Sequence, residues 1–186
     1  MADHRLLVEE RAHYDLRPLP TLAGPKLLLR DLVTHVGFQQ LTAFRCASAL
    51  HRKGFGAAAM VVCRLIRFVY GAEMHWASEI APGILLVHGN GIVISRAARI
   101  GAGCVLFPNV TIGTSRDADG RDGAPVLLEG VHVGVGAAVL GPVTIGPHSK
   151  IGPNAVVKAS VGANMSVMAA EPLVTSRPTS SHWPRT

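Results

Sequence analysis

The sequence predicts a mainly β protein, a parallel β-helix built from hexapeptide repeats and preceded by an N-terminal α-helical region. Three observations support this fold class. Branched aliphatic residues return at every sixth position through the second half of the chain, at Leu127, Val133, Val139, Ile145, Ile151 and Val157. A small or short side chain follows each of them by four residues, and a period of six fits neither an α-helix nor an ordinary strand. Aromatic residues make up only 5% of the chain, while 20 glycines and 12 prolines suit a narrow tube that turns a corner in every repeat.

The helical region comes before the repeats. Apolar residues at helical spacing run from Leu29 to Val69 with a break at Gly54 and Gly56, which predicts two or three helices within residues 26–70. We expect their apolar faces to pack on each other and on the open end of the tube, because the first coil of a solenoid needs a cap.

The repeats set the domain organisation. Three hexapeptides close one triangular coil, so the chain holds about four coils. In this arrangement Leu127, Ile145 and Ala163 stack near one edge of the tube. The predicted parts are an arm with the helical region at 1–72, the β-helix at 73–165 and a C-terminal tail at 166–186.

Composition narrows the possible partners. The formal net charge of +6 comes mainly from residues outside the repeats and forms no basic stripe interleaved with aromatics, so we expect no nucleic-acid partner. The apolar run at 57–63 is much shorter than the about 20 residues of a membrane span, so we expect no membrane segment. Cys46, Cys63 and Cys104 are odd in number and far apart, which predicts a reduced, cytoplasmic chain in which Cys104 faces inward.

The repeat rhythm breaks twice, and breaks in a solenoid are where binding surface is built. The first break adds two residues between Leu86 and Ile94 and puts His88 among glycines. A histidine exposed there suits a general base for a hydroxyl group, and Glu73, nearly one coil below, is a candidate to orient it. The alternatives are a surface histidine on a tolerated insertion and a solvated carboxylate at the end of the helical region.

The second break, residues 113–126, is a polar excursion of a length that is usually functional. Its aspartates lack the spacing and the closing glutamate of a calcium loop, so we expect it to fold over a substrate. A zinc site made by His88, His132 and His148 is an alternative, but the last two residues occupy different parts of the triangle. We therefore expect no metal.

Residues 73–95, which read EMHWASEIAPGILLVHGNGIVIS, resemble the start of the β-helix of the serine acetyltransferases. Residues 98–113 and 128–146 keep the spacing of that family. The repeats alone indicate only a hexapeptide protein, whereas the His-Gly-x-Gly-Ile-Val-Ile segment is much more specific. The resemblance covers about residues 36–172 and is closest to short members with a truncated helical region. It implies a left-handed parallel β-helix.

The resemblance also implies an acetyl-CoA-dependent O-acetyltransferase that works by direct transfer. His88 falls on the histidine that deprotonates the acceptor hydroxyl, and Glu73 falls where the family has the aspartate that orients this histidine. The positions expected near the co-substrate acetyl-CoA are Thr111, Gly113, Gly134, Val135, Lys150 and Gly152. The assembly implied is a homotrimer of parallel tubes with sites at the grooves between them.

Two departures from the family concern the acceptor. Val87 stands where the long serine enzymes have a second aspartate, and Gly123 and Ala124 stand where they have an arginine and a histidine. Arg116, Arg121 and Asp122 are candidates to replace the missing groups from shifted positions, and we expect Arg121 and Asp122 to bind the substrate, because a serine carboxylate prefers a guanidinium and its ammonium a carboxylate. The alternatives are the same chemistry on a sugar or a biosynthetic intermediate, and a non-catalytic or metal-dependent hexapeptide protein.

Overall fold

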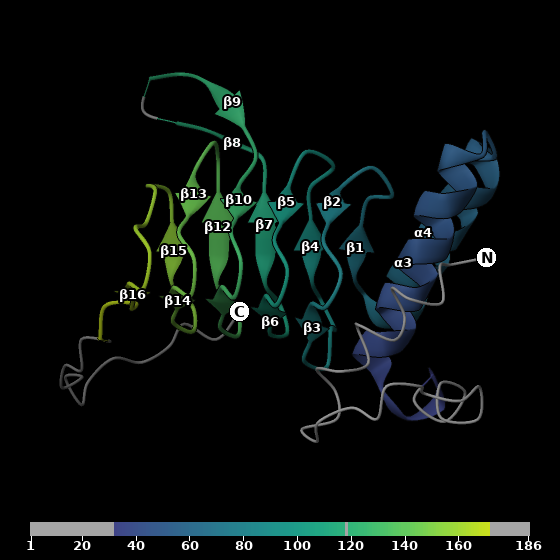
Figure 1. Cartoon of the computed structure of the whole chain (residues 1–186), viewed down its shortest axis with the longest axis horizontal. Coiled ribbons are helices and arrows are strands. Elements are labelled where there is room, and N and C mark those ends of the chain that lie inside the picture. Colours follow the sequence, from purple (N-terminus) through teal and green to yellow (C-terminus); the bar gives the residue numbers. More distant parts are fainter. Residues whose placement is uncertain (1–31, 118, 172–186) are drawn as a thin grey trace, which may run out of the picture.

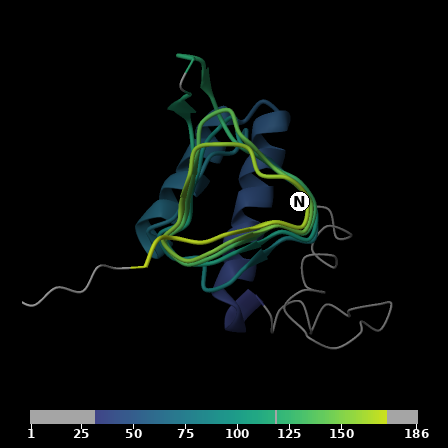
Figure 2. The same ribbon diagram turned by 90° about the vertical axis from the view of Figure 1, so that its left-hand side faces the viewer.

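The computed structural model describes residues 32–117 and 119–171. They form a tube of short parallel strands in three sheets, with two helices packed across one end (Figure 1). Seen along its axis the tube is a triangle with one sheet on each side (Figure 2). The predicted parallel β-helix with an N-terminal helical region is confirmed.

The two helices are α3 (Val36–Arg52) and α4 (Gly56–Tyr70). α4 ends where Gly71 adopts a left-handed conformation with a φ of 62°, and this turns the chain into the first strand. The helices pack on each other and on the first coil as predicted, and the side chains of Phe44 and Ile66, at most 2% exposed, join the core of the tube. Within the described residues no helix is long and apolar enough to cross a membrane.

The strands visit three sheets in turn, so that each coil uses one strand of each sheet. Sheet A contains β1 (Glu73–Met74), β4 (Val93–Ile94), β7 (Thr111–Gly113), β12 (Ala138–Leu140) and β15 (Val156–Val157). Sheet B contains β2 (Glu79–Ile80), β5 (Arg99–Ile100), β10 (Val126–Leu127) and β13 (Thr144–Ile145). Sheet C contains β3 (Leu85–Leu86), β6 (Val105–Leu106), β11 (His132–Val133), β14 (Lys150–Ile151) and β16 (Ser166–Val167).

The strand register explains the period of six. In β4 the second residue, Ile94, points inward and is 1% exposed, whereas Val93 points outward and is 37% exposed. Parallel pairing places Ile94 on Ile112 and Ile112 on Val139, so the inward side chains form continuous columns. Burying each of these side chains stabilises the tube by roughly 1.5–3 kcal/mol.

The number of strands and the last coil differ from the prediction. Sheets A and C hold five strands each, one more than about four coils require, because β1 is added at the start of sheet A and β16 at the end of sheet C. Ile145 bridges to Val161, so the expected stacking on Ala163 is wrong and this coil is two residues short. The shortening falls in the corner after β15, where the Ser160 hydroxyl accepts a hydrogen bond from the backbone N–H of Thr144 at 3.0 Å. β16 lies just beyond the predicted end of the β-helix at residue 165.

The polar excursion forms an antiparallel hairpin of β8 (Ser115–Arg116) and β9 (Asp122–Gly123). It projects from the corner between sheets A and B (Figure 1). The coils on either side continue across it, because Val126 pairs in register with both Arg99 and Thr144. The hairpin therefore adds surface without interrupting the core.

Candidate active site

His88 lies on an irregular turn at the corner where the chain passes from sheet C to sheet A. Each of the later coils has one residue with positive φ at this corner, and these residues are Asn109, Gly136 and Asn154. Gly91 holds this position in the first coil, and the two added residues before it, His88 and Gly89, also have positive φ values of 56° and 33°. The side chain of His88 is exposed on the resulting bulge.

The bulge is fixed from two sides. The backbone N–H of Gly91 donates to the carbonyl of Tyr70 at the end of α4 (3.3 Å), and the carbonyl of Asn90 accepts from the N–H of Asn109 in the next coil (2.9 Å). A histidine in the left-handed region costs roughly 1–3 kcal/mol and persists only where the surroundings enforce it. The helical cap and the second coil supply that constraint.

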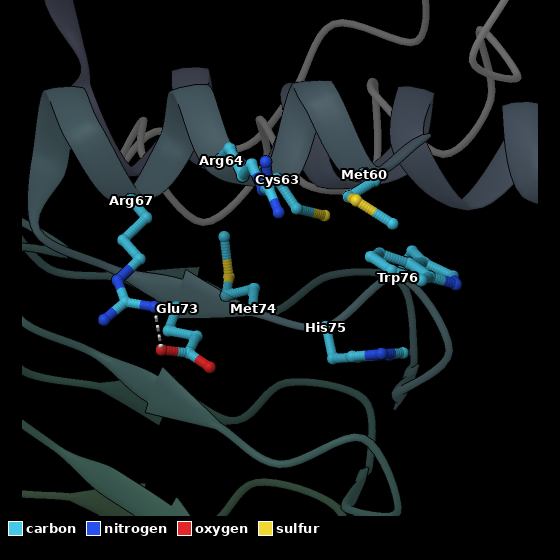
Figure 3. A pocket seen from close by; sticks show the side chains of 8 residues that line it. All are labelled: Met60, Cys63, Arg64, Arg67, Glu73, Met74, His75 and Trp76. Atoms are coloured by element: carbon cyan, nitrogen blue, oxygen red, sulfur yellow. Dashed lines mark ion pairs between the residues drawn. The ribbon is translucent and has the colours of Figure 1, made fainter. Parts of the chain in front are cut away.

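Glu73 begins β1, directly after the helical cap. Its backbone N–H donates to the carbonyl of Ile92 at 2.7 Å, which places the residue one coil below the His88 turn, close to the predicted position. Its carboxylate forms an ion pair with Arg67 of α4 at 3.3 Å (Figure 3). Among the described residues no hydrogen bond joins Glu73 to His88, so their catalytic partnership stays a prediction. Sequence reasoning missed Arg67, because only the reversal of the chain from α4 into β1 brings it to the carboxylate.

A cavity of about 160 Å³ opens beside this ion pair, between α4 and the first coil (Figure 3). Its lining residues are Met60, Cys63, Arg64, Arg67, Glu73, Met74, His75 and Trp76. Burial lowers the pKa of His75, and the charges of Arg96 and His51 act in the same direction while Glu73 opposes them. The cavity follows β1 from Glu73 toward the corner between sheets A and B, so it extends away from the His88 turn.

The residues predicted to contact acetyl-CoA are Thr111, Gly113, Gly134, Val135, Lys150 and Gly152. Gly134 and Val135 lie in the corner between sheets C and A, Gly152 lies in the same corner one coil later, and Lys150 precedes it on β14. This is the edge of the tube that carries His88 in the first coil. The other two residues are the ends of β7 on sheet A. Their contact with acetyl-CoA stays a prediction.

The charged side chains of the hairpin pair with each other. Arg116 donates two hydrogen bonds to the carboxylate of Asp122, at 3.0 and 3.1 Å. Arg121 donates to Asp117 at 2.9 Å and to Asp119 at 2.8 Å. The backbone N–H of Arg121, together with its guanidinium, lowers the pKa of Asp117. Arg121 and Asp122, the predicted substrate contacts, are thus both engaged within the hairpin.

The hairpin and His88 lie on opposite edges of sheet A. Each strand of this sheet runs from the corner shared with sheet C, where His88 lies, to the corner shared with sheet B, from which the hairpin projects. The width of a sheet therefore separates the two features within one chain.

The remaining histidines of the repeats do not converge with His88. His132 lies on β11, and burial followed by the charge of Lys150 lowers its pKa. His148 lies at the corner between sheets B and C, 3.8 Å from the carboxylate of Glu129. In the part of the chain that the structure describes, no group of three His, Cys, Asp or Glu residues is placed to hold a metal ion.

Cys104 faces inward, as the repeat pattern predicts. It is 0% exposed, and its thiol donates to the carbonyl of Leu128 at 3.1 Å. Burial raises the pKa of Cys104 to about 11. The thiolate is the nucleophilic form of cysteine, so this residue is a poor candidate for covalent catalysis.

Comparison with known proteins decides the family. Residues 124–159 match the sequence model of a protein family described as bacterial transferase hexapeptide (six repeats). The chain is 37% identical over 126 residues to a serine acetyltransferase of Helicobacter pylori (strain ATCC 700392 / 26695), which is 68% of this chain and 73% of that protein. The chain belongs to the serine acetyltransferase family. This confirms the predicted family and enzyme class, an acetyl-CoA-dependent O-acetyltransferase.

Solved structures of family members support the same conclusion. Serine acetyltransferase isoform 3 of Entamoeba histolytica, in complex with cysteine, matches with a TM-score of 0.77 at 26% identity, over 94% of this chain and 60% of that one. The Brucella abortus enzyme in complex with coenzyme A matches with a TM-score of 0.74 at 28% identity, over 90% of this chain and 65% of that one. The chain is a left-handed parallel β-helix like these proteins and spans a little under two thirds of their length.

Proposed function

We propose that this serine acetyltransferase family member moves the acetyl group of acetyl-CoA to the hydroxyl of serine, with His88 as the general base. The observation that carries the proposal is the placement of His88, which is exposed on a glycine-flanked bulge within the family's specific segment. The bulge shares one edge of the tube with the corner residues that we expect to contact acetyl-CoA, Gly134, Val135 and Gly152.

The reaction needs no covalent enzyme intermediate. A ring nitrogen of His88 takes the proton of the acceptor hydroxyl as the oxygen forms a bond to the thioester carbonyl carbon. The tetrahedral intermediate carries its negative charge on the former carbonyl oxygen, where backbone N–H groups stabilise it. Its collapse breaks the carbon–sulfur bond, and the leaving thiolate takes the proton from the imidazolium.

Glu73 orients the imidazole in this proposal. A carboxylate that accepts a hydrogen bond from one ring nitrogen leaves the other nitrogen free to act as the base. The Glu73 carboxylate lies at the surface, and its ion pair with Arg67 is of a kind worth about 0–1 kcal/mol. So weak a pair leaves the carboxylate able to turn toward His88 during the reaction.

Acetyl-CoA lies lengthwise along the edge between sheets C and A. Its pantetheine arm passes Gly134 and Val135, while Lys150 and Gly152 lie further along, where the lysine can meet a phosphate. The co-substrate is the best supported part of the proposal, because a relative with a matching fold binds coenzyme A.

We infer that the protein works as a homotrimer. Because the width of sheet A separates His88 from the hairpin within one chain, the hairpin can reach the reaction centre only from a neighbouring copy. Light scattering on the purified protein is expected to give three times the mass of one chain, and a monomer with full activity would refute this assembly. The free cysteines Cys46, Cys63 and Cys104 are consistent with the reducing cytoplasm.

One observation favours a second candidate, the same transfer to a different acceptor. Gly123 and Ala124 replace the family's arginine and histidine, and Arg121 and Asp122 are paired within the hairpin. A sugar or an amino acid derivative without a free carboxylate needs neither partner.

An acceptor panel distinguishes the two candidates. Purified protein is mixed with acetyl-CoA and with serine, serine derivatives or sugars, and free coenzyme A thiol is measured. The main proposal predicts the highest kcat/KM with serine, and a higher value with another hydroxyl compound supports the second candidate. If no compound of the panel raises thiol release above the rate at which acetyl-CoA is hydrolysed without an acceptor, both candidates are refuted.

A further inference from the structure

A buried glutamine lies directly beneath the His88 turn. Gln40 of α3 is 0% exposed, and neither its Oε1 nor its Nε2 has a hydrogen-bond partner in the structure. The carboxamide lies against Gly89, so closely that a methyl group on Gly89 would collide with Oε1 and with the amide carbon. An unpaired polar group is therefore in contact with the residue next to the proposed base.

Packing does not account for an amide at this position. A buried donor or acceptor without a partner costs about 1–3 kcal/mol, whereas an apolar side chain of the same shape avoids that cost. Methionine would fill nearly the same space within the helical cap. The amide of Gln40 therefore lowers the stability of the fold, and this indicates a role in function rather than in packing.

The neighbours of Gln40 indicate what the amide acts on. The adjacent residue, Gln39, is engaged elsewhere, since its Oε1 accepts from the hydroxyl of Tyr70 at 2.6 Å. The carbonyl of Tyr70 in turn accepts the N–H of Gly91, at the far end of the bulge. α3 therefore reaches the His88 turn by two routes, through Tyr70 to Gly91 and directly from Gln40 to Gly89.

We propose that Gln40 is a positioning residue for His88. Its side chain holds Gly89 in the left-handed conformation, and its amide hydrogen-bonds to the turn when the acceptor is bound, so that the imidazole keeps the direction needed for proton transfer. This rests on the proposed function of His88 and assigns to the reaction a residue that lies outside the hexapeptide repeats.

The test compares Gln40→Met with Thr42→Val. Methionine keeps the volume and removes the amide, and Thr42 is a matched control because its Oγ1 is also buried on α3 without a partner. Gln40→Met is expected to lower kcat about 10- to 100-fold, as misplacement of a catalytic group does, with the KM for acetyl-CoA unchanged. The NMR signal of the His88 imidazole, assigned with His88→Asn, is expected to shift, and the melting temperature is not expected to fall. Thr42→Val should leave kcat and the imidazole signal as they are.

Several results would overturn the proposal. A Gln40→Met variant with the kcat and the His88 signal of the unmodified protein refutes it, and so does a lower melting temperature with unchanged kcat, which would give Gln40 a role in the cap alone. If the unmodified protein transfers no acetyl group, the proposed function fails, but an unmoved imidazole signal in Gln40→Met still refutes the positioning role. If Gln40→Met does not fold, Gly89→Ala disturbs the same contact from the other side and is expected to cause the same loss.

Discussion

Replacing His88 by asparagine tests the proposed mechanism at its central residue. The choice of asparagine follows from the backbone, because His88 has a φ of 56° and asparagine tolerates this region better than alanine does. The imidazole is exposed and makes no hydrogen bond within the described residues, so the substitution removes no packing and leaves no buried group unpaired. A change in rate can then be attributed to the loss of the base.

The expected magnitudes separate catalysis from stability. A positioned general base contributes about 10²- to 10⁴-fold, which is roughly 2.7–5.4 kcal/mol of transition-state stabilisation at about 1.36 kcal/mol for each factor of ten. An exposed substitution away from the core changes the free energy of unfolding by less than about 0.5 kcal/mol. His88→Asn should therefore lose nearly all turnover while the midpoint of urea unfolding stays in place.

The assay measures thiol release from acetyl-CoA with the best acceptor of the panel. His148→Asn is the matched control, because His148 is also an exposed corner histidine with a φ of 56°. Its turnover is expected to stay within about twofold of the unmodified protein, since exposed substitutions away from a site have little effect. If His88→Asn kept more than about a tenth of kcat, far above the range for a lost base, the assignment of His88 would be wrong. An equal loss in His148→Asn would refute it as well.

Three further predictions concern single side chains of the β-helix and the helical cap. The Ser149 hydroxyl donates a hydrogen bond to the Gly162 carbonyl (2.7 Å) and accepts one from the Met165 N–H (3.1 Å), both in the last coil. Ser149→Ala removes both bonds and should lower the free energy of unfolding by about 1–3 kcal/mol in urea titrations. An unchanged midpoint of urea unfolding would contradict this. At pH 8, iodoacetamide should modify Cys46 before Cys104, whose pKa is raised to about 11, and peptide mass spectrometry showing the reverse order would refute the inward placement. Burial, and then the charge of Lys150, lower the pKa of His132 from 6.5, so the folded protein holds this imidazole in its neutral form more strongly than the unfolded chain does. The folded state therefore has its full stability above about pH 6.5 and loses part of it as the pH falls through the lowered pKa. The melting temperature should therefore drop more steeply below pH 6.5 in the unmodified protein than in His132→Gln, and equal slopes would contradict this reasoning.

The tube could be predicted from the sequence because its geometry is local and repetitive. An inward aliphatic residue at every sixth position requires one short strand per repeat, and the pairing of Ile94 with Ile112 follows once eighteen residues close a coil. The bulge at His88 was visible for the same reason, as two residues in excess of the period. The polar composition of residues 113–126 likewise marked them as an excursion between two repeats.

The missed features depend on contacts between parts of the chain with no common period. The ion pair of Arg67 with Glu73 joins a helix to a strand across a reversal of the chain. The contact of Gln40 with Gly89 joins the cap to the bulge over a long sequence separation, and a buried glutamine on a helix gives no pattern of its own. The short last coil was missed because Ala163 continues the period of six, although Val161 makes the bridge.

The hairpin between sheets A and B is tied together by the ion pairs of its own residues, and the ladders of the tube pass it without interruption. The residues that we propose to contact the acceptor and the residues that keep the scaffold folded are thus separate sets of amino acids. Evolution can rewrite the first set while leaving the second alone, and an engineer who transplants a foreign hairpin between Gly113 and Val126 inherits the same freedom.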